Sequence, residues 1–190
     1  SVKVIDYPVV PKAPYSPSHI KNAAMGLFVG LFISAGFVVL LETLDTKIIS
    51  EREIDTAAEI IRQGGLVIFP TETVYGLGAN ALDSTASAKI YAAKGRPSDN
   101  PLICHLSSAD DAEKYCVVNE MYKKLAARFM PGPITVILPK KYDEKGEPIV
   151  PDTTTGGLDS VAVRVPSNRI ARALIAKAGL PIAAPSANIS

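Results

Sequence analysis

The chain has 190 residues, enough for one ordinary domain with an appendage, and its 47% hydrophobic content can supply a buried core. Twenty basic residues against nineteen acidic ones give a net charge of +1, which excludes a polycation that binds nucleic acid by total charge. Any anion-binding site must therefore be local. The only cysteines, Cys104 and Cys116, lack the spacing of zinc or redox motifs and the density of secreted disulfide proteins, so we expect reduced structural thiols.

The first predicted segment is a stalk. Prolines recur at every third position in residues 9–17, at Pro11, Pro14 and Pro17. Each proline fixes its own φ and disfavours helix in the residue before it. This pattern predicts a stiff, extended segment at the beginning of the chain.

Residues 23–41 form an apolar run of nineteen residues without a charge. That length spans the hydrocarbon core of a bilayer as a helix, so we predict one transmembrane helix here. A buried core helix is the alternative, whereas a cleaved signal peptide is disfavoured because acidic residues follow the run. Gly26, Gly30 and Ser34 share one helical face, which would allow a second membrane helix to approach closely.

The beginning of the chain carries a first resemblance. DYPVVPKAPYSP, then the glycine-rich apolar run, then LLETLDTKI resemble the C-terminal membrane end of polysaccharide chain-length determinant (Wzz-like) proteins of bacterial envelopes. We therefore expect residues 1–45 to form a Pro-rich stalk and membrane helix, and residues 46–190 to form a separate domain.

The second part of the chain alternates helix and strand patterns, as soluble α/β domains do. An amphipathic helix is predicted over residues 54–63 and a buried strand over residues 66–69. Residues 71–78, TETVYGLG, then predict a loop with two threonine hydroxyls, a carboxylate and a phenol. Hydroxyl-rich loops after strands often bind ligands, although a plain strand-to-turn connection stays open as the alternative.

A helix predicted over residues 83–93, capped by Asp83 or Ser84, leads into Lys94-Gly95-Arg96. The tripeptide presents a compact ammonium and a planar guanidinium on backbone that glycine allows to turn sharply. These two cationic groups are suited to hydrogen-bonding the oxygens of a polyphosphate. Taken alone, the tripeptide also fits a solvated basic loop.

The remaining elements follow at short intervals. Helices are predicted over residues 109–115, 120–129 and 169–178, and strands over residues 102–106, 134–138, 161–165 and 181–184. Residues 140–157 are polar and rich in glycine and proline, which predicts a mobile loop over a site.

Three strand residues and the polar segment 185–188 are further candidates. His105 is either a structural residue or a site residue, and Thr135 begins its predicted strand. Arg164 interrupts an apolar strand, so it needs an anionic partner from the protein or from a ligand. Residues 185–188, Pro-Ser-Ala-Asn, follow the last predicted strand.

Five blocks carry a second and more specific resemblance: GGLVIFPTETVYGLGANALD, AAKGRPSDNPLICHL, FMPGPITVILP, VAVRVP and PIAAPSANIS. In this order and spacing they closely resemble the threonylcarbamoyl-AMP synthase (YrdC-like) family over residues 46–190. The resemblance implies a twisted, mixed α/β sheet flanked by helices, with an open basic cavity. It also implies a reaction in which L-threonine, bicarbonate and ATP give threonylcarbamoyl-AMP and pyrophosphate.

The resemblance assigns roles to individual residues. Lys94 and Arg96 would clamp the phosphates and the threonine-derived carbamate. The remaining site residues it implies for the substrate and nucleotide are Thr71, Thr73, Tyr75, His105, Thr135, Arg164, Ser186 and Asn188. Magnesium would arrive with ATP, because the sequence contains no dedicated metal cage.

The resemblance also implies partners and a location. The product would feed N6-threonylcarbamoyladenosine at position 37 of tRNA, completed by a separate transferase complex, and contact with tRNA or double-stranded RNA would follow. The catalytic domain would lie in the cytoplasm, anchored by the membrane helix. Lys12 and Lys21 before the helix against Lys47 and Arg52 after it leave the orientation undecided.

Two departures from the family pattern leave other functions open. The family domain continues through further strands beyond the 185–188 motif, so we expect a sheet and a pocket that are incomplete at the C-terminus, and the family is ordinarily soluble. One alternative is a carbamoyl-transfer domain of the hydrogenase-maturation type. Another is a non-enzymatic membrane envelope protein that carries a nucleotide-binding or RNA-binding fragment.

Overall fold

A computed structural model of the chain describes residues 18–44 and 51–188, with the side chains of residues 18–37 and 52–188. The chain divides into two units, Ser1–Thr46 and Lys47–Ser190. The predicted proline-rich stalk, residues 9–17, lies outside the described residues.

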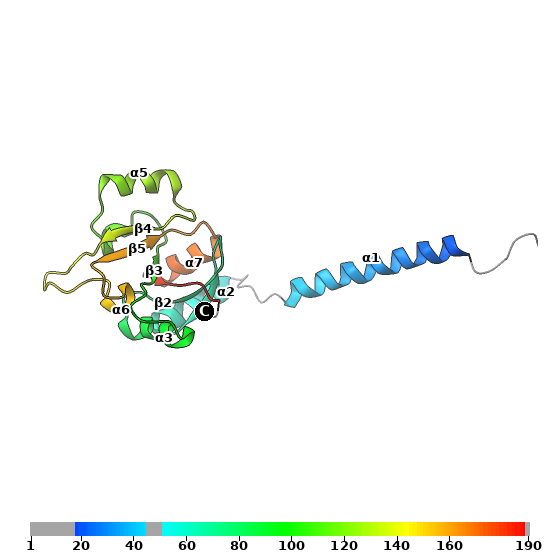
Figure 1. Cartoon of the computed structure of the whole chain (residues 1–190), viewed down its shortest axis with the longest axis horizontal. Helices are drawn as coiled ribbons and strands as arrows, with labels where there is room; N and C mark the ends of the chain where they lie inside the picture. The colour runs from blue at the N-terminus through cyan, green and yellow to red at the C-terminus, as the bar shows by residue number, and fades with distance from the viewer. Residues whose placement is uncertain (1–17, 45–50, 189–190) are drawn as a thin grey trace, which may run out of the picture. The chain divides into compact units, whose positions relative to one another are not determined.

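The first unit contains the helix α1, His19–Leu44, which is longer than the predicted 23–41 (Figure 1). Its window His19–Phe37 is long and apolar enough to cross a membrane, by length and composition alone. The side chains of residues 18–37 are all exposed, which does not agree with the alternative of a buried core helix. Apart from the helix's own backbone and the neighbouring residues, no described atom lies within 4 Å of a Cβ built on Gly26 or Gly30.

The second unit is a mixed sheet of six strands flanked by helices, as expected (Figure 1). The strand order is β1-β2-β6-β3-β5-β4, in which β3 and β5 are parallel and the other neighbours are antiparallel. The strands are β1 (Val67–Pro70), β2 (Tyr75–Asn80), β3 (Ile103–His105), β4 (Val136–Pro139), β5 (Ser160–Arg164) and β6 (Ile182–Ala183). The helices are α2 (Glu51–Arg62), α3 (Ser84–Lys94), α4 (Ala112–Tyr115), α5 (Glu120–Phe129), α6 (Asp152–Thr155) and α7 (Arg169–Ala178).

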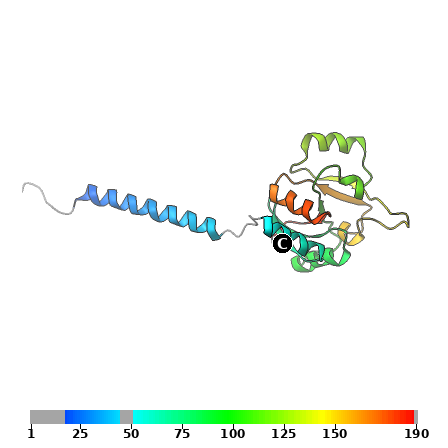
Figure 2. The same cartoon turned by 180° about the vertical axis from the view of Figure 1, so that it is seen from behind.

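Two cores lie on opposite faces of the sheet. On one face α2 and α7 pack side by side against Phe69 and Ile182 (Figure 2). On the other face, Ile90 of α3 and Tyr122 of α5 belong to the larger core around Cys104. On the face that carries α2 and α7, the strand β4 is exposed to solvent, since the side chain of Ile137 is 69% exposed.

The strand β2 was not predicted, because residues 71–78 were interpreted as a loop. Only residues 71–74 form a loop, and Tyr75–Asn80 pairs with both β1 and β6. Of the two glycines that suggested a loop, Gly78 is required by packing, since a Cβ there would lie 2.6 Å from Cε1 of Phe69. Glycine here marks a close approach within a sheet.

The prediction of a mobile loop over residues 140–157 is wrong at both ends of the segment. Lys140 is buried at its beginning, and α6 lies near its end with Thr154 and Thr155 buried. These polar side chains are buried because they have partners: Lys140 pairs with Asp152, and Thr154 bonds to Ser87 and Ala81.

Both ends of α3 have the expected caps. Asp83 Oδ1 accepts hydrogen bonds from the backbone N–H groups of Thr85 and Ala86 at 2.8 and 3.3 Å. Gly95, at φ 59° and ψ 25°, ends the helix in the left-handed conformation. Ala93, in the last turn, is exposed. The caps fix the point at which Lys94 and Arg96 leave the helix.

The N-cap of α3 gives a test of the fold. Replacing Asp83 by Ala removes the acceptor for two backbone N–H groups, so we expect a loss of about 1 kcal/mol in unfolding free energy. Urea unfolding followed by tyrosine fluorescence measures the loss. Ser84→Ala, one position further and exposed, is the matched control. Equal stability of the two variants would contradict the assigned cap.

Candidate functional site

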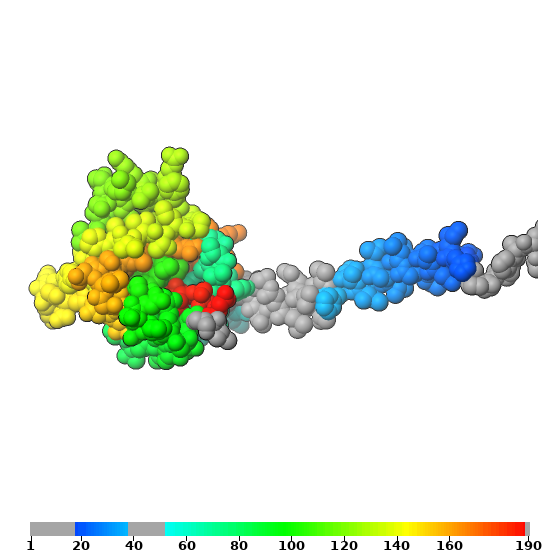
Figure 3. Space-filling model, viewed as in Figure 1, coloured from blue at the N-terminus to red at the C-terminus, as the bar shows by residue number. Residues whose placement is uncertain are grey.

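The end of α3 and residues 185–188 lie together, although they are more than ninety positions apart. Lys94 Nζ donates to the backbone carbonyls of Ser186, at 2.6 Å, and of Asn188. In Figure 3 the red surface near residue 185 accordingly lies against the green surface of α3. Two of the predicted polar clusters therefore form one site, in which the side chains of Ser186 and Asn188 are exposed.

Backbone pairing holds residues 185–188 in place. The N–H of Leu77 donates to the carbonyl of Pro185 at 3.1 Å, and the N–H of Ala187 donates to the carbonyl of Tyr75 at 2.7 Å. The segment thus continues the pairing of β6 with β2. Tyr75 itself begins β2, and its side chain is 42% exposed beside this segment.

Arg96 is half-buried beyond the left-handed Gly95. Its Nη2 donates to the carbonyl of Pro101 at 3.3 Å, while its Nε is buried and has no hydrogen-bond partner among the described residues. An unpaired buried donor costs free energy, so an acceptor brought by a ligand or by water would be favourable at this atom.

Arg164 has an anionic partner in the protein, and that partner is Glu72. Arg164 Nη2 and Nε both donate to Glu72 Oε1, at 2.5 and 3.1 Å, and the two side chains are only 11% and 15% exposed. Partial burial acts to raise the pKa of Glu72, but the hydrogen bonds and charge of Arg164 outweigh it and hold the pKa below its usual value. Glu72 is therefore ionised at neutral pH.

The threonines of the loop between β1 and β2 lie at this ion pair. Thr73 Oγ1 accepts from Arg164 Nη2 at 3.3 Å, and it lies 3.1 Å from Thr71 Oγ1. Thr71 Oγ1 also donates to the carbonyl of Val74 at 2.5 Å, which closes a local turn. The loop therefore presents one hydroxyl directly at the guanidinium and uses the other to fix its own shape.

His105 forms part of the wall beside the ion pair. It is in register with Arg164, is only 3% exposed, and has its ring edge-on to Phe69 at a centroid distance of 6.0 Å. Burial, followed by the charge of Arg164, lowers the pKa of His105 to about 4. The imidazole is therefore neutral at neutral pH, so it contributes shape and polarity to the site but no positive charge.

Thr135 lies one residue before β4, and not within the strand as predicted. Ile137 pairs with Ala162, two residues before Arg164, so alternation places Thr135, Ile137 and Arg164 on one face of the sheet. The side chain of Thr135 is exposed on this face, and no described hydrogen bond joins it to the other candidates.

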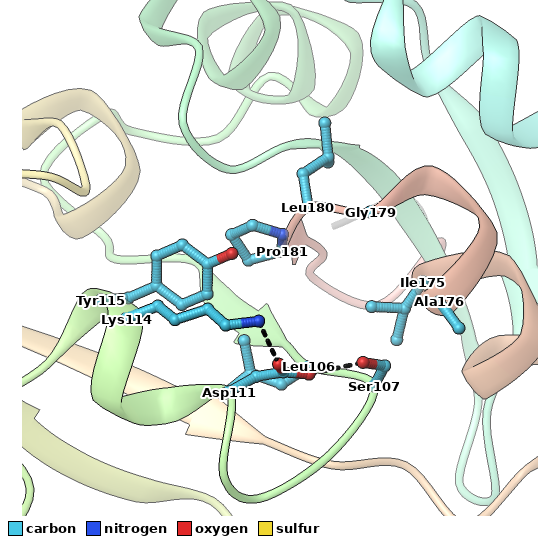
Figure 4. A pocket seen from close by; sticks show the side chains of 10 residues that line it. All are labelled: Leu106, Ser107, Asp111, Lys114, Tyr115, Ile175, Ala176, Gly179, Leu180 and Pro181. Atoms are coloured by element: carbon cyan, nitrogen blue, oxygen red, sulfur yellow. Dashed lines mark hydrogen bonds and ion pairs between the residues drawn. The ribbon is translucent and has the colours of Figure 1, made fainter.

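A separate cavity of about 210 Å³ contains none of these predicted residues (Figure 4). It lies beyond the C-terminal end of β3, between Leu106 and Pro181. Three of its polar side chains are paired with one another, since Asp111 Oδ1 accepts from Lys114 at 2.7 Å and Asp111 Oδ2 from Ser107 at 2.5 Å. This cavity does not mark the site.

Sequence reasoning named Glu72 only as a loop carboxylate and did not include it among the site residues. The signal was present, because an arginine inside an apolar strand requires a counter-ion. Within the described residues, no cluster of three or more His, Cys, Asp or Glu side chains forms a candidate metal site.

Comparisons with known proteins identify the second unit. A family model named for Sua5, YciO and YrdC, and described as telomere recombination, matches residues 59–190. A threonylcarbamoyl-AMP synthase of Pyrococcus abyssi is 54% identical over 143 residues, which are 75% of this chain and 40% of that protein. One from Bacillus subtilis is 48% identical over 155 residues, 81% of this chain and 42% of that protein. The chain thus spans about two fifths of the length of these relatives.

Solved structures agree. The crystal structure of P. abyssi Sua5 complexed with L-threonine aligns with a TM-score of 0.70 at 54% identity, over 76% of this chain and 41% of that chain. The crystal structure of Escherichia coli YciO aligns with a TM-score of 0.62 at 28% identity, over 72% of this chain and 64% of that chain. Full-length HypF in its phosphate- and nucleotide-bound form aligns with a TM-score of 0.61 at 26% identity, over 72% of this chain and 20% of that chain. These matches do not test the resemblance of residues 1–45 to chain-length determinants, which stays a prediction.

The Glu72–Arg164 pair predicts a pH dependence of stability. Because the folded pKa of Glu72 is lowered from 4.5, its contribution is complete at higher pH and is lost as the pH falls below that value. We expect Glu72→Gln to lower the unfolding free energy by about 1–2 kcal/mol at pH 7 and by progressively less below pH 4.5. Urea unfolding of both proteins between pH 3 and about 7 measures the difference.

Glu59→Gln is the matched control for this measurement. Glu59 also pairs with an arginine, but the Glu59 and Arg62 side chains are 53% and 40% exposed. Solvent screens such a pair, so we expect a much smaller change. A difference between Glu72→Gln and the unsubstituted chain that does not depend on pH would contradict the assigned ion pair.

Proposed function

Because the chain belongs to the Sua5/YciO/YrdC family, we propose that residues 46–190 carry the active site of a threonylcarbamoyl-AMP synthase. The proposed substrates are L-threonine, bicarbonate and ATP, and the products are threonylcarbamoyl-AMP and pyrophosphate. The observation that carries the proposal is the hydrogen bonding of Lys94 to residues 186 and 188, which joins two of the five family blocks into one cationic site. The names of the similar relatives support the same activity.

The proposed reaction mainly requires the protein to stabilise negative charge. The amine of threonine combines with bicarbonate to give a carbamate and water. An oxygen of that carbamate then attacks the α-phosphorus of ATP, and the bond from this phosphorus to the bridging oxygen breaks to release pyrophosphate. No covalent intermediate with the protein is needed. The protein must hold the triphosphate and neutralise the charge that moves to the leaving group.

Lys94 and Arg96 are suited to this task. An ammonium has three donors, and two of those of Lys94 are directed at the carbonyls of Ser186 and Asn188, which leaves one for a phosphate or carbamate oxygen. The buried Nε of Arg96 offers a second donor. The exposed side chains of Ser186 and Asn188 would bind the nucleotide or the threonine.

The threonine pocket is proposed at the other side of the site. Glu72 accepts hydrogen bonds from Nε and Nη2 of Arg164, so Nη1 is the guanidinium nitrogen that would donate to a substrate carboxylate. Thr73 and Tyr75 would contact the amino acid, Thr71 would hold the loop, and Thr135 would face the nucleotide. The relative crystallised with L-threonine supports an amino-acid pocket in this fold.

Magnesium and the partners belong to the same proposal. Magnesium would be held by the phosphates of ATP, where it would offset their charge. The product would pass to a separate transferase that completes N6-threonylcarbamoyladenosine on tRNA, and direct contact with tRNA or double-stranded RNA is part of the proposal. Because ATP and tRNA are cytoplasmic, the domain is proposed to lie in the cytoplasm.

We propose that α1 anchors the domain in the membrane. The window His19–Phe37 has the length and composition for this, and its side chains are exposed. An exposed apolar helix of this length is unfavourable in water, because its side chains bury no surface. A bilayer would remove that cost.

Pyrophosphate exchange tests the proposed activity. With the 190-residue chain in detergent, labelled pyrophosphate should enter ATP only when threonine and bicarbonate are both present. We expect Lys94→Ala to lower the exchange rate by about 10²–10³-fold, because it removes a donor to the charge that develops in the transition state. Lys124→Ala, on the exposed side of α5, is the matched control and should retain the rate.

The other functions predict different outcomes of this assay. A carbamoyl-transfer domain of the hydrogenase-maturation type would use carbamoyl phosphate and would be indifferent to threonine, and HypF is a structural relative. A non-enzymatic envelope protein would form no adenylate with either substrate. Either result would overturn the proposed function for this chain.

Fractionation tests the anchor. The chain should remain in the membrane pellet after an alkaline carbonate wash. Phe28→Arg together with Phe32→Arg should release it, because each arginine near the middle of a membrane helix costs about 3 kcal/mol. Replacing both residues by Leu should leave it in the pellet. Recovery of the unsubstituted chain in the soluble fraction would contradict the anchor.

A further inference from the structure

The short helix α6 is joined to the loop that follows Arg96 through backbone contacts. The N–H of Leu102 donates to the carbonyl of Thr154 at 2.9 Å. Gly156, which ends α6, lies so close to the same loop that an added Cβ would be 2.7 Å from the carbonyl oxygen of Asp99. Figure 1 shows α6 beside α3, the helix that Arg96 follows.

The loop of residues 97–101 in turn orients the guanidinium of Arg96. The carbonyl of Pro101 accepts from Arg96 Nη2 at 3.3 Å. The neighbouring carbonyl of Asn100 accepts from the hydroxyl of Tyr91 at 3.0 Å, which ties the loop back to α3. The direction of Arg96 therefore depends on where the carbonyls of this loop lie.

A buried polar network fixes α6 itself. Thr154 Oγ1 donates to the carbonyl of Ala81 at 2.8 Å and lies 2.7 Å from Ser87 Oγ of α3. A hydroxyl has one proton, so Ser87 must be the donor to Thr154. Both side chains are completely buried, and a buried network whose members are all satisfied permits only one arrangement of its elements.

A buried lysine adds a second tie. The side chain of Lys140 is 1% exposed, and its Nζ pairs with Asp152 Oδ1 at 2.5 Å. Asp152 is the first residue of α6. The helix is therefore held at Asp152 by Lys140, which directly follows β4, and at Thr154 by Ser87 of α3.

We propose that α6, through Thr154 and Gly156, positions Arg96 for the triphosphate. Thr154 is a positioning residue, and Gly156 is the position at which only hydrogen leaves room for the Asp99 carbonyl. The inference rests on the proposed function, because it takes Arg96 to be the group that contacts ATP. It adds a structural cause for the orientation of Arg96. That cause is α6 with Gly156, and these residues lie outside all five sequence blocks.

The chain offers a matched pair of substitutions for the test. Gly156 has φ +62° and Gly157 has φ +79°, so an alanine at either position meets similar backbone strain. Only Gly156 lies against the loop, since nothing is within 4 Å of a Cβ on Gly157. The difference between Gly156→Ala and Gly157→Ala therefore isolates the contact with the Asp99 carbonyl.

Two readouts on the full chain decide the proposal. The first is kcat/KM for ATP in the exchange reaction, which should be about tenfold or more lower in Gly156→Ala than in Gly157→Ala, because small displacements of a catalytic group are costly. The second is the NMR signal of Arg96 Nε–H, identified by its loss in Arg96→Lys. It should shift in Gly156→Ala and keep its position in Gly157→Ala.

Thr154 supplies an independent variant. Thr154→Val removes the hydroxyl while keeping the shape, and it should shift the Arg96 signal and lower kcat/KM, whereas Thr154→Ser should restore both. Unchanged Arg96 signals in Gly156→Ala and Thr154→Val would overturn the positioning role, whatever the activity. Shifted signals in a chain without exchange activity would support the positioning role while overturning the proposed function.

Discussion

The backbone pairing of two residues, Ile182 and Ala183, holds the two halves of the sheet together. The strand β6 pairs with β2 on one side and with β3 on the other, so it joins the hairpin of β1 and β2 to the remaining strands. It also brings residues 185–188 to the end of α3, where the Lys94 ammonium bonds to their carbonyls. A strand of only two residues can do this because its side chains are buried in both cores.

The charged groups of the site are held in place before any ligand binds. Lys94 is fixed by two carbonyls, Arg164 by Glu72 and Thr73, and Arg96 in part by Pro101. Each of these side chains would otherwise lose conformational freedom on binding a phosphate or a carboxylate. Pairing with protein atoms removes much of that cost, and the electrostatic catalysis proposed for this site requires charged groups that are held in place in this way.

Helices with clear local signals were predicted well. The bounds of α5 and α7 agree with prediction, because each begins at an asparagine that caps it and has one apolar face. The strand β2 was missed because Gly76 and Gly78 disfavour a strand locally, and only their packing against Phe69, Ile182 and Ala184 in the folded sheet explains them. The helix α6 was missed for a related reason, since its four residues are too few to show a period and are held by Ser87 of α3 and by Lys140, which follows β4.

By itself the sequence determined the mixed α/β class, the family blocks, the residue types of the site and the need of Arg164 for a counter-ion, because propensity, period and charge are local properties. Only the tertiary structure decided which groups meet. Glu72 lies 92 positions before Arg164, and Lys94 lies 92 positions before Ser186. Such pairs depend on strand order and register, which follow from the packing of the whole sheet and not from any local pattern.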